Sequence, residues 1–161
     1  MHMSTACVVL LPSDVEPNAP LTDALRLLGW SIGRDALRDG CCVLYDLTAK
    51  SELVGEACAR VLRELIAQLR ARDCALIFLL AGRPTGIASL VPELALAAAP
   101  GCRVNALHVP GGSNRCTAPD MARSLRFLVG ARAVTGQILH LTPPISDAAA
   151  AGSRSARLSA P

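Results

Sequence analysis

The segment Cys74–Ala81, which reads CALIFLLA, decides the fold because all eight of its residues are apolar. An apolar run of this length without polar alternation is typical of a strand buried on both faces of a parallel sheet. The preceding segment, Ser51–Arg72, is amphipathic with helical spacing, and the following segment, Ile87–Ala99, is apolar on nearly all sides. A buried strand between two helices predicts a parallel sheet with helices on its faces.

Four further apolar runs have the length of strands, and two further segments have the spacing of amphipathic helices. Pro92 predicts that the regular part of the Ile87–Ala99 helix begins only near Val91. Together the elements predict a three-layer α/β/α sandwich with a mainly parallel five-stranded sheet, Rossmann-like or flavodoxin-like. The further strands are predicted at Ala6–Leu11, Cys41–Leu47, Arg103–Val109 and Gln137–Thr142, and the further helices at Leu21–Leu28 and Pro119–Leu128.

The length of 161 residues suits one domain with a sizeable core. We expect this domain at residues 1–142, followed by a flexible tail at residues 143–161 that is rich in Ala, Ser and Arg and has no apolar period. Hydrophobic residues make up 52% of the chain and charged residues 18%, which excludes a disordered protein.

Charge and apolar patterning exclude several classes of partner. The net charge is only +3, the arginines are scattered and the aromatic residues are too few for a base-stacking surface, so no nucleic acid is expected. No apolar run reaches the roughly 18 residues that span a bilayer, and the N-terminus shows no secretion signal. We therefore expect a cytoplasmic protein without a membrane partner.

The seven cysteines and three histidines show no metal-ligand spacing. Because most cysteines lie inside apolar runs, we expect buried, reduced thiols and no metal site. His108 and His140 lie within predicted strands and are expected in the core or at an interface. Asp46 ends a strand and is either a general base or the cap of the following turn.

Two stretches near the C-terminal end of the predicted domain resemble the short-chain dehydrogenase/reductase superfamily. The segment Cys102–Gly111 contains R-V-N-A followed shortly by P-G, as in a late strand of that superfamily. The segment Ser124–Leu141 contains T-G-Q and is similar to its C-terminal helix and final strand. The resemblance extends over about Cys41–Thr142, and it places Cys74–Ala81 as the central strand, where the superfamily has its catalytic residues.

The motifs that the superfamily uses for chemistry are missing. The turn after Ala6–Leu11 begins with Pro12 and carries no G-x-x-x-G-x-G loop for a dinucleotide. The only tyrosine is Tyr45 and the only lysine is Lys50, so no Tyr-x-x-x-Lys pair occurs. The closest pattern is the N-terminal flavodoxin-like domain of high-molecular-weight 3-oxoacyl-[acyl-carrier-protein] reductases. This resemblance implies a catalytically degenerate protein, a structural or partner subunit that dimerises or pairs with an active reductase.

The resemblance also implies which surface assembles, because the superfamily uses the helices flanking the central strand and the final strand. The charge-poor Ile87–Ala99 helix is accordingly the predicted interface, through Leu90, Val91 and Leu94. The expected partner is a second copy or a related reductase subunit. No cofactor is expected, since neither NADP nor FMN has a supporting motif.

An alternative is a small oxidoreductase or ligand-binding protein that uses loops at the carboxyl ends of the strands. Its ligand would be a 3-oxoacyl thioester, a flavin or a nicotinamide nucleotide. The loop after Cys74–Ala81 offers backbone amides and one cation, and the loop after Arg103–Val109 is rich in glycine. The candidate ligand-binding residues are Gly82, Arg83, Thr85, Gly86, Gly111, Gly112, Ser113 and Asn114.

Overall fold

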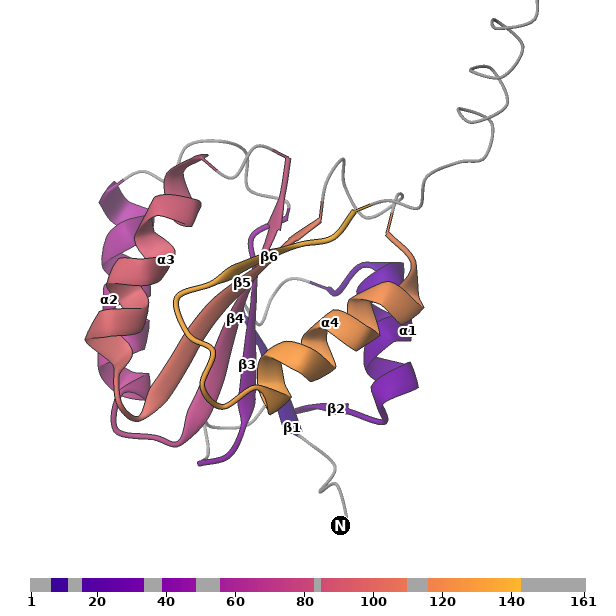
Figure 1. Ribbon diagram of the computed structural model, residues 1–161, viewed down its shortest axis with the longest axis horizontal. Helices are drawn as coiled ribbons and strands as arrows, with labels where there is room; N and C mark the ends of the chain where they lie inside the picture. The colour runs from indigo at the N-terminus through magenta and orange to yellow at the C-terminus, as the bar shows by residue number, and fades with distance from the viewer. Residues whose placement is uncertain are drawn as a thin grey trace, which may run out of the picture.

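Six parallel strands form one sheet in the order β2-β1-β3-β4-β5-β6 (Figure 1). The computed structural model describes residues 7–11, 16–33, 39–48, 56–82, 85–109 and 116–142. The strands are β1 (Cys7–Leu11), β2 (Ser31–Gly33), β3 (Cys42–Asp46), β4 (Cys74–Ala81), β5 (Cys102–Val109) and β6 (Ile138–His140). The helices are α1 (Ala19–Leu28), α2 (Glu56–Leu69), α3 (Thr85–Ala98) and α4 (Ala118–Gly130).

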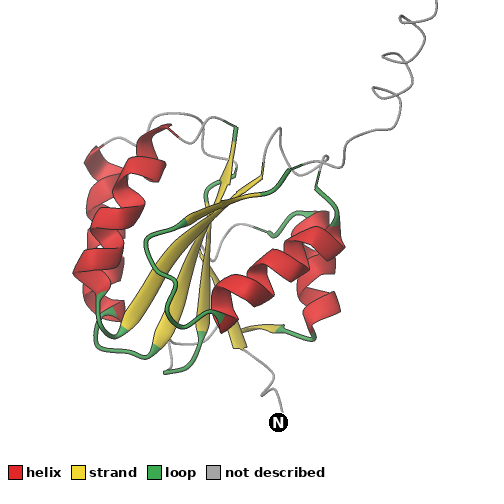
Figure 2. Cartoon of the chain, in the orientation of Figure 1, coloured by secondary structure: helices red, strands yellow, loops and turns green. Residues whose placement is uncertain are grey.

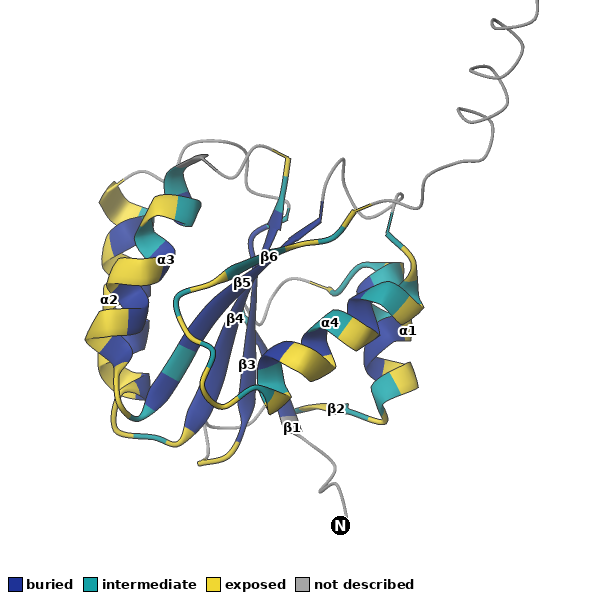
Figure 3. Ribbon diagram, viewed as in Figure 1, coloured by how far each residue is buried: buried dark blue, intermediate teal, exposed yellow. Residues whose placement is uncertain are grey.

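The helices form two layers, with α1 and α4 on one face of the sheet and α2 and α3 on the other (Figures 1 and 2). Successive residues of a strand point to opposite faces, so the central strands supply side chains to both layers. β3 and β4 are buried along almost their whole length, as Figure 3 shows. This arrangement confirms the predicted three-layer α/β/α sandwich and its parallel sheet.

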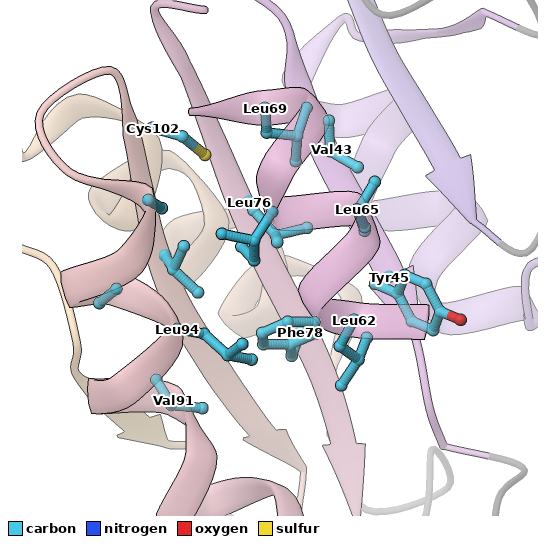
Figure 4. Close-up of a cluster of buried hydrophobic side chains, with 14 of the residues drawn as sticks. Val43, Tyr45, Leu62, Leu65, Leu69, Leu76, Phe78, Val91, Leu94 and Cys102 are labelled. Carbon is cyan, nitrogen blue, oxygen red and sulfur yellow. The ribbon is translucent and has the colours of Figure 1, made fainter. Parts of the chain in front are cut away.

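The core under α2 and α3 packs leucines from both helices against β3 and β4 (Figure 4). Phe78 is fully buried at its centre, and its ring contacts the Tyr45 ring edge to face with a centroid distance of 6.1 Å. Burial of each such leucine or phenylalanine side chain contributes about 1.5–3 kcal/mol. The side chains labelled in Figure 4 are Val43, Tyr45, Leu62, Leu65, Leu69, Leu76, Phe78, Val91, Leu94 and Cys102.

The prediction of five strands is wrong by one, because β2 adds an edge strand beside β1. β2 has only three residues, and its one large apolar side chain, Ile32, is 42% exposed. An edge strand this short buries too little to leave an apolar run in the sequence. The other five strands lie where they were predicted, within one to two residues at each end.

The prediction that Pro92 delays the start of α3 is also wrong, because the helix runs from Thr85 through Pro92 to Ala98. Pro92 lies on the exposed side of α3, while Val91 and Leu94 bury their side chains against the sheet. Packing of this inner face therefore outweighs the backbone hydrogen bond that the proline removes. The tail predicted at 143–161 lies outside the described residues.

In the part of the chain that the structure describes, no helix is long and apolar enough to cross a membrane.

Candidate functional site at the carboxyl edge of the sheet

All strands are parallel, so their carboxyl ends meet at one edge of the sheet, where ligands bind in open α/β folds. A small pocket opens at this edge on the side of α1 and α4. It lies at the carboxyl ends of the three neighbouring strands β3, β4 and β5. The residues that line it come from the first turns of both helices and the ends of three strands: Asn18, Leu21, Thr48, Leu79, Val109 and Met121.

The polar side chains near this pocket already have partners within the chain. The Asn18 Oδ1 accepts a hydrogen bond from the Leu21 amide at 3.0 Å and caps α1. The Asp46 Oδ1 accepts hydrogen bonds from the Thr48 amide at 2.9 Å and from the Thr48 Oγ1 at 2.6 Å. Asp46 thus caps its turn, which confirms one of its two predicted roles. Among the described residues, no charged side chain lines the pocket, so these walls suit a small, weakly polar group.

A second arrangement at the carboxyl edge joins three strands on the side of α3. His108 and His140 are partners in the β5–β6 register, and their Nδ1 atoms lie 3.0 Å apart. The Nε2 of His108 lies 2.7 Å from the carbonyl oxygen of Gly82, just after β4. His108 is 9% exposed, whereas His140 is exposed. His108 is therefore a core residue, which is one of the two placements predicted for it.

The hydrogen bonds determine how protons are placed on the two rings. A carbonyl oxygen only accepts, so the His108 Nε2 must donate to Gly82. In the neutral form of His108 the Nδ1 is then a bare acceptor, and the His140 Nδ1 donates to it. Sequence reasoning missed this pair because only the strand register places residues 32 positions apart side by side.

The structure describes only part of the predicted ligand loops. Gly82 has a positive φ of 69°, which favours glycine. Its carbonyl oxygen accepts the hydrogen bond from His108. Thr85 and Gly86 form the first turn of α3. Arg83 and the segment Gly111–Asn114 lie outside the described residues. β4 and β5 end side by side at Ala81 and Val109, so the two predicted loops begin next to each other.

The three predicted interface residues point toward the chain's own core. Val91 is 0% and Leu94 is 2% exposed, and Leu90 packs half-buried against the same cluster. A partner that contacts α3 would therefore meet its opposite side, where Leu96 is 81% exposed. The periodicity of α3 could not separate these two sides, since both are apolar.

The six cysteines whose side chains the structure describes are buried or half-buried. Cys41, Cys42, Cys74 and Cys102 are buried, as expected, and Cys58 and Cys116 are half-buried. Burial raises the pKa of the Cys42 thiol far above its usual range, and it also raises the pKa of Cys116. The Cys74 thiol donates to the Leu69 carbonyl oxygen. The interaction between the Cys74 and Cys102 side chains raises the pKa of Cys74 and lowers that of Cys102. Among the described residues, no three His, Cys, Asp or Glu side chains converge on a metal position.

The R-V-N-A and T-G-Q stretches are joined to each other through Asn105. This side chain is 1% exposed; its Nδ2 donates to the Val134 carbonyl at 3.0 Å, and its Oδ1 accepts from the Gln137 amide at 3.1 Å. The Thr135 Oγ1 accepts from the Val104 amide at 3.1 Å. We call Asn105, Val134, Thr135 and Gln137 the β5–β6 clamp, because it fixes the chain between α4 and β6.

Arg103 extends the clamp to the end of α4. Its Nη1 donates to the carbonyl oxygens of Leu128 and Ala131, both at 3.3 Å. These carbonyls lie at the C-terminal end of a helix, where a cation is favourable. Gly136 passes α3 closely with a φ of 72°, and a Cβ there would lie 3.5 Å from the Ala95 side chain. The two stretches thus position β6 and hold α4.

A comparison with protein families finds a match over residues 46–141 to the model described as SDR-like, short chain dehydrogenase-like protein. A search of curated proteins finds no match. The matched segment runs from the end of β3 to just beyond β6, so it contains the clamp, α3 and the histidine pair.

Proposed function

The chain belongs to the short chain dehydrogenase-like family, and from this premise we propose that it is an assembly domain that performs no hydride transfer. It would act as a structural subunit that dimerises or pairs with an active reductase. The observation that carries this proposal is the contrast between the family features that the chain keeps and those that it lacks. It keeps the clamp and lacks the tyrosine–lysine pair.

The features that the chain keeps are structural. The polar groups of the R-V-N-A and T-G-Q stretches form hydrogen bonds with one another and with the backbone just before β6. Groups satisfied in this way stabilise an edge of the sheet and have little capacity left for a substrate. The final strand and α3 belong to the elements that the superfamily uses in assembly. Their preservation supports a role in assembly.

The features that the chain lacks are chemical. Reduction by a nicotinamide cofactor requires a cradle for the pyrophosphate and a proton donor with a suitable pKa. α3, which corresponds to the helix of the tyrosine and lysine, contains neither residue. Tyr45 instead lies on β3, 6% exposed, with its ring against Phe78. This placement supports a role for Tyr45 in packing.

The outer side of α3 supports contact with a partner. Its exposed residues are mostly small or apolar, and its only charged side chain, Glu93, lies 3.4 Å from Arg63 of α2. Leu96 projects from this side and is 81% exposed. Exposed apolar side chains with few charges around them are typical of the centre of an interface. The exposed residues of α3 are Ser89, Pro92, Glu93, Leu96 and Ala97.

Sedimentation equilibrium tests this proposal with two matched variants. Leu96→Arg places a charge on the outer side of α3, and Phe127→Arg does the same on α4, where the side chain is 53% exposed. We expect a wild-type dimer, an association that Leu96→Arg weakens about 10-fold or more (about 1.4 kcal/mol), and no change in Phe127→Arg. A wild-type monomer at about 100 μM without a reductase partner in pull-down would contradict the proposal.

A second function, binding of a small ligand, is favoured by the pocket at the carboxyl ends of β3, β4 and β5. The ligand would be a 3-oxoacyl thioester, a flavin or a nicotinamide nucleotide, of which only a small group would enter the pocket. Fluorescence titration with FMN and NADPH tests this function. Saturable binding that is weakened by Thr48→Val, which removes a hydroxyl from the pocket wall, would favour this function over assembly alone.

A further inference from the structure

We propose that His108 and His140 form a two-imidazole site for a divalent transition-metal ion such as Ni²⁺ or Cu²⁺. The proposal goes beyond the assembly role and departs from the expectation that the chain has no metal site. It rests on three observations: the Nδ1–Nδ1 distance of 3.0 Å, the hydrogen bond from the His108 Nε2 to Gly82, and the location at the carboxyl edge of the sheet.

The distance between the two nitrogens selects a class of metal geometry. A metal–imidazole bond measures about 2.0–2.1 Å, so two nitrogens 3.0 Å apart subtend an angle of about 91–97° at a metal bound to both. Neighbouring positions of a square-planar or octahedral ion lie about 90° apart, whereas a tetrahedral ion would need nitrogens about 3.3 Å apart. The pair therefore fits Ni²⁺ or Cu²⁺ better than tetrahedral Zn²⁺.

The Gly82 carbonyl prepares His108 for this role. A metal-binding histidine usually donates its second ring N–H to a carbonyl or carboxylate, which fixes the tautomer and the ring orientation. The His108 Nε2 makes such a bond at 2.7 Å, so its Nδ1 lone pair is directed at His140. The rings meet at 75° with centroids 5.0 Å apart. Because His108 is held by Gly82, the exposed His140 ring has to rotate for both lone pairs to meet at one ion.

Metal binding requires one proton to move. In the neutral pair the His140 Nδ1 carries the proton that is shared with His108. When the proton moves to the Nε2 of His140, both Nδ1 atoms become ligands without a net loss of charge. His140 is exposed, so its Nε2–H is satisfied by water. Since no third His, Cys, Asp or Glu joins the pair among the described residues, water or an added chelator completes the coordination.

Calorimetric titration with Ni²⁺–nitrilotriacetate tests the site, because this complex offers two neighbouring open positions. The matched probe is a Ni²⁺ complex of a pentadentate chelator, which offers only one. We expect wild-type protein to bind the first probe about 10–100-fold more tightly than the second, because the second imidazole binds intramolecularly. His140→Asn should bring both affinities to the same low value. His2→Asn controls for the third histidine and should change nothing.

Several outcomes would overturn the proposal. Equal affinities of wild-type protein for the two probes would mean that only one exposed imidazole binds. Loss of binding in His2→Asn would place the ion at the N-terminus. His108→Asn should weaken binding as much as His140→Asn does; if it folds by circular dichroism and binds like wild type, the pair is not the site. The two-probe comparison on wild-type protein decides the question even where His108→Asn does not fold.

Discussion

α3 and α4 pack against opposite faces of the sheet beside β5 (Figure 3). They differ in the number of charged residues on their outer sides. α4 begins with a Thr117 cap and carries Asp120, Arg123 and Arg126 on its surface. α3 carries one charged residue, Glu93. The charge pattern of α4 is that of a helix that faces water. The pattern of α3 is that of a helix covered on both sides. The described part of the chain covers only one of these sides.

The inner sides of the two helices are equally buried, so α3 and α4 differ only on their outer sides. Leu94 of α3 is 2% exposed, and Leu125 of α4 is 0% exposed. Each packs into its own core cluster against the central strands. Both helices therefore contribute to folding in the same way, and the outer side of α3 is where a separate role has to be sought.

The largest effect is expected from charges placed on the inner sides. Leu94→Arg and Leu125→Arg should each lower the free energy of unfolding by about 4 kcal/mol or more, because a charge replaces a fully packed side chain. Urea unfolding measures this loss. If Leu94→Arg instead left stability unchanged and only dissociated a dimer, the inner side of α3 would be the interface, and the comparison with α4 would fail.

A smaller loss is expected from the β5–β6 clamp. Asn105→Ala removes hydrogen bonds to the Val134 carbonyl and the Gln137 amide and leaves them without this partner. We expect the free energy of unfolding to fall by about 2–4 kcal/mol, with amide exchange accelerated at β6 before the rest of the sheet. Gln137→Ala is the control, because its backbone amide still binds Asn105. Uniform exchange across the sheet would argue against a local clamp.

The smallest change in the free energy of unfolding is expected from replacing Pro92. Pro92→Ala restores a backbone donor within α3 and should raise the free energy of unfolding by about 1–3 kcal/mol. Pro119→Ala, in the first turn of α4, should change it by less than about 0.5 kcal/mol, because proline is tolerated there. Thermal unfolding measures both. A loss of stability in Pro92→Ala would mean that the proline itself contributes packing on the outer side of α3.

Patterns within one element predicted that element well. The unbroken apolar run of β4 and the spacing of α2 lead directly to the observed strand and helix. β2 could not be predicted because its side chains lie largely outside the core and form no apolar run. The start of α3 was predicted wrongly because Pro92 lies on the exposed side of the helix, where it does not disturb the packing of the inner side.

The candidate site was harder to predict because its contacts join distant parts of the chain. The Asn105 clamp and the His108–His140 pair both depend on the β5–β6 register. Local spacing placed Asp46 at its turn, where two donors from Thr48 reach it. It could not bring Asn18 and Thr48 to one pocket, since that requires α1 and β3 to be positioned by the sheet order.

We propose that this member of the short chain dehydrogenase-like family keeps the fold without hydride transfer. Following nicotinamide absorbance with NADPH and an acetoacetyl thioester tests it most directly, with an active reductase as the positive control. The account predicts no loss of absorbance that depends on the protein, because neither a dinucleotide loop nor a tyrosine–lysine pair is present. Turnover that saturates with substrate and disappears in Tyr45→Phe would contradict it.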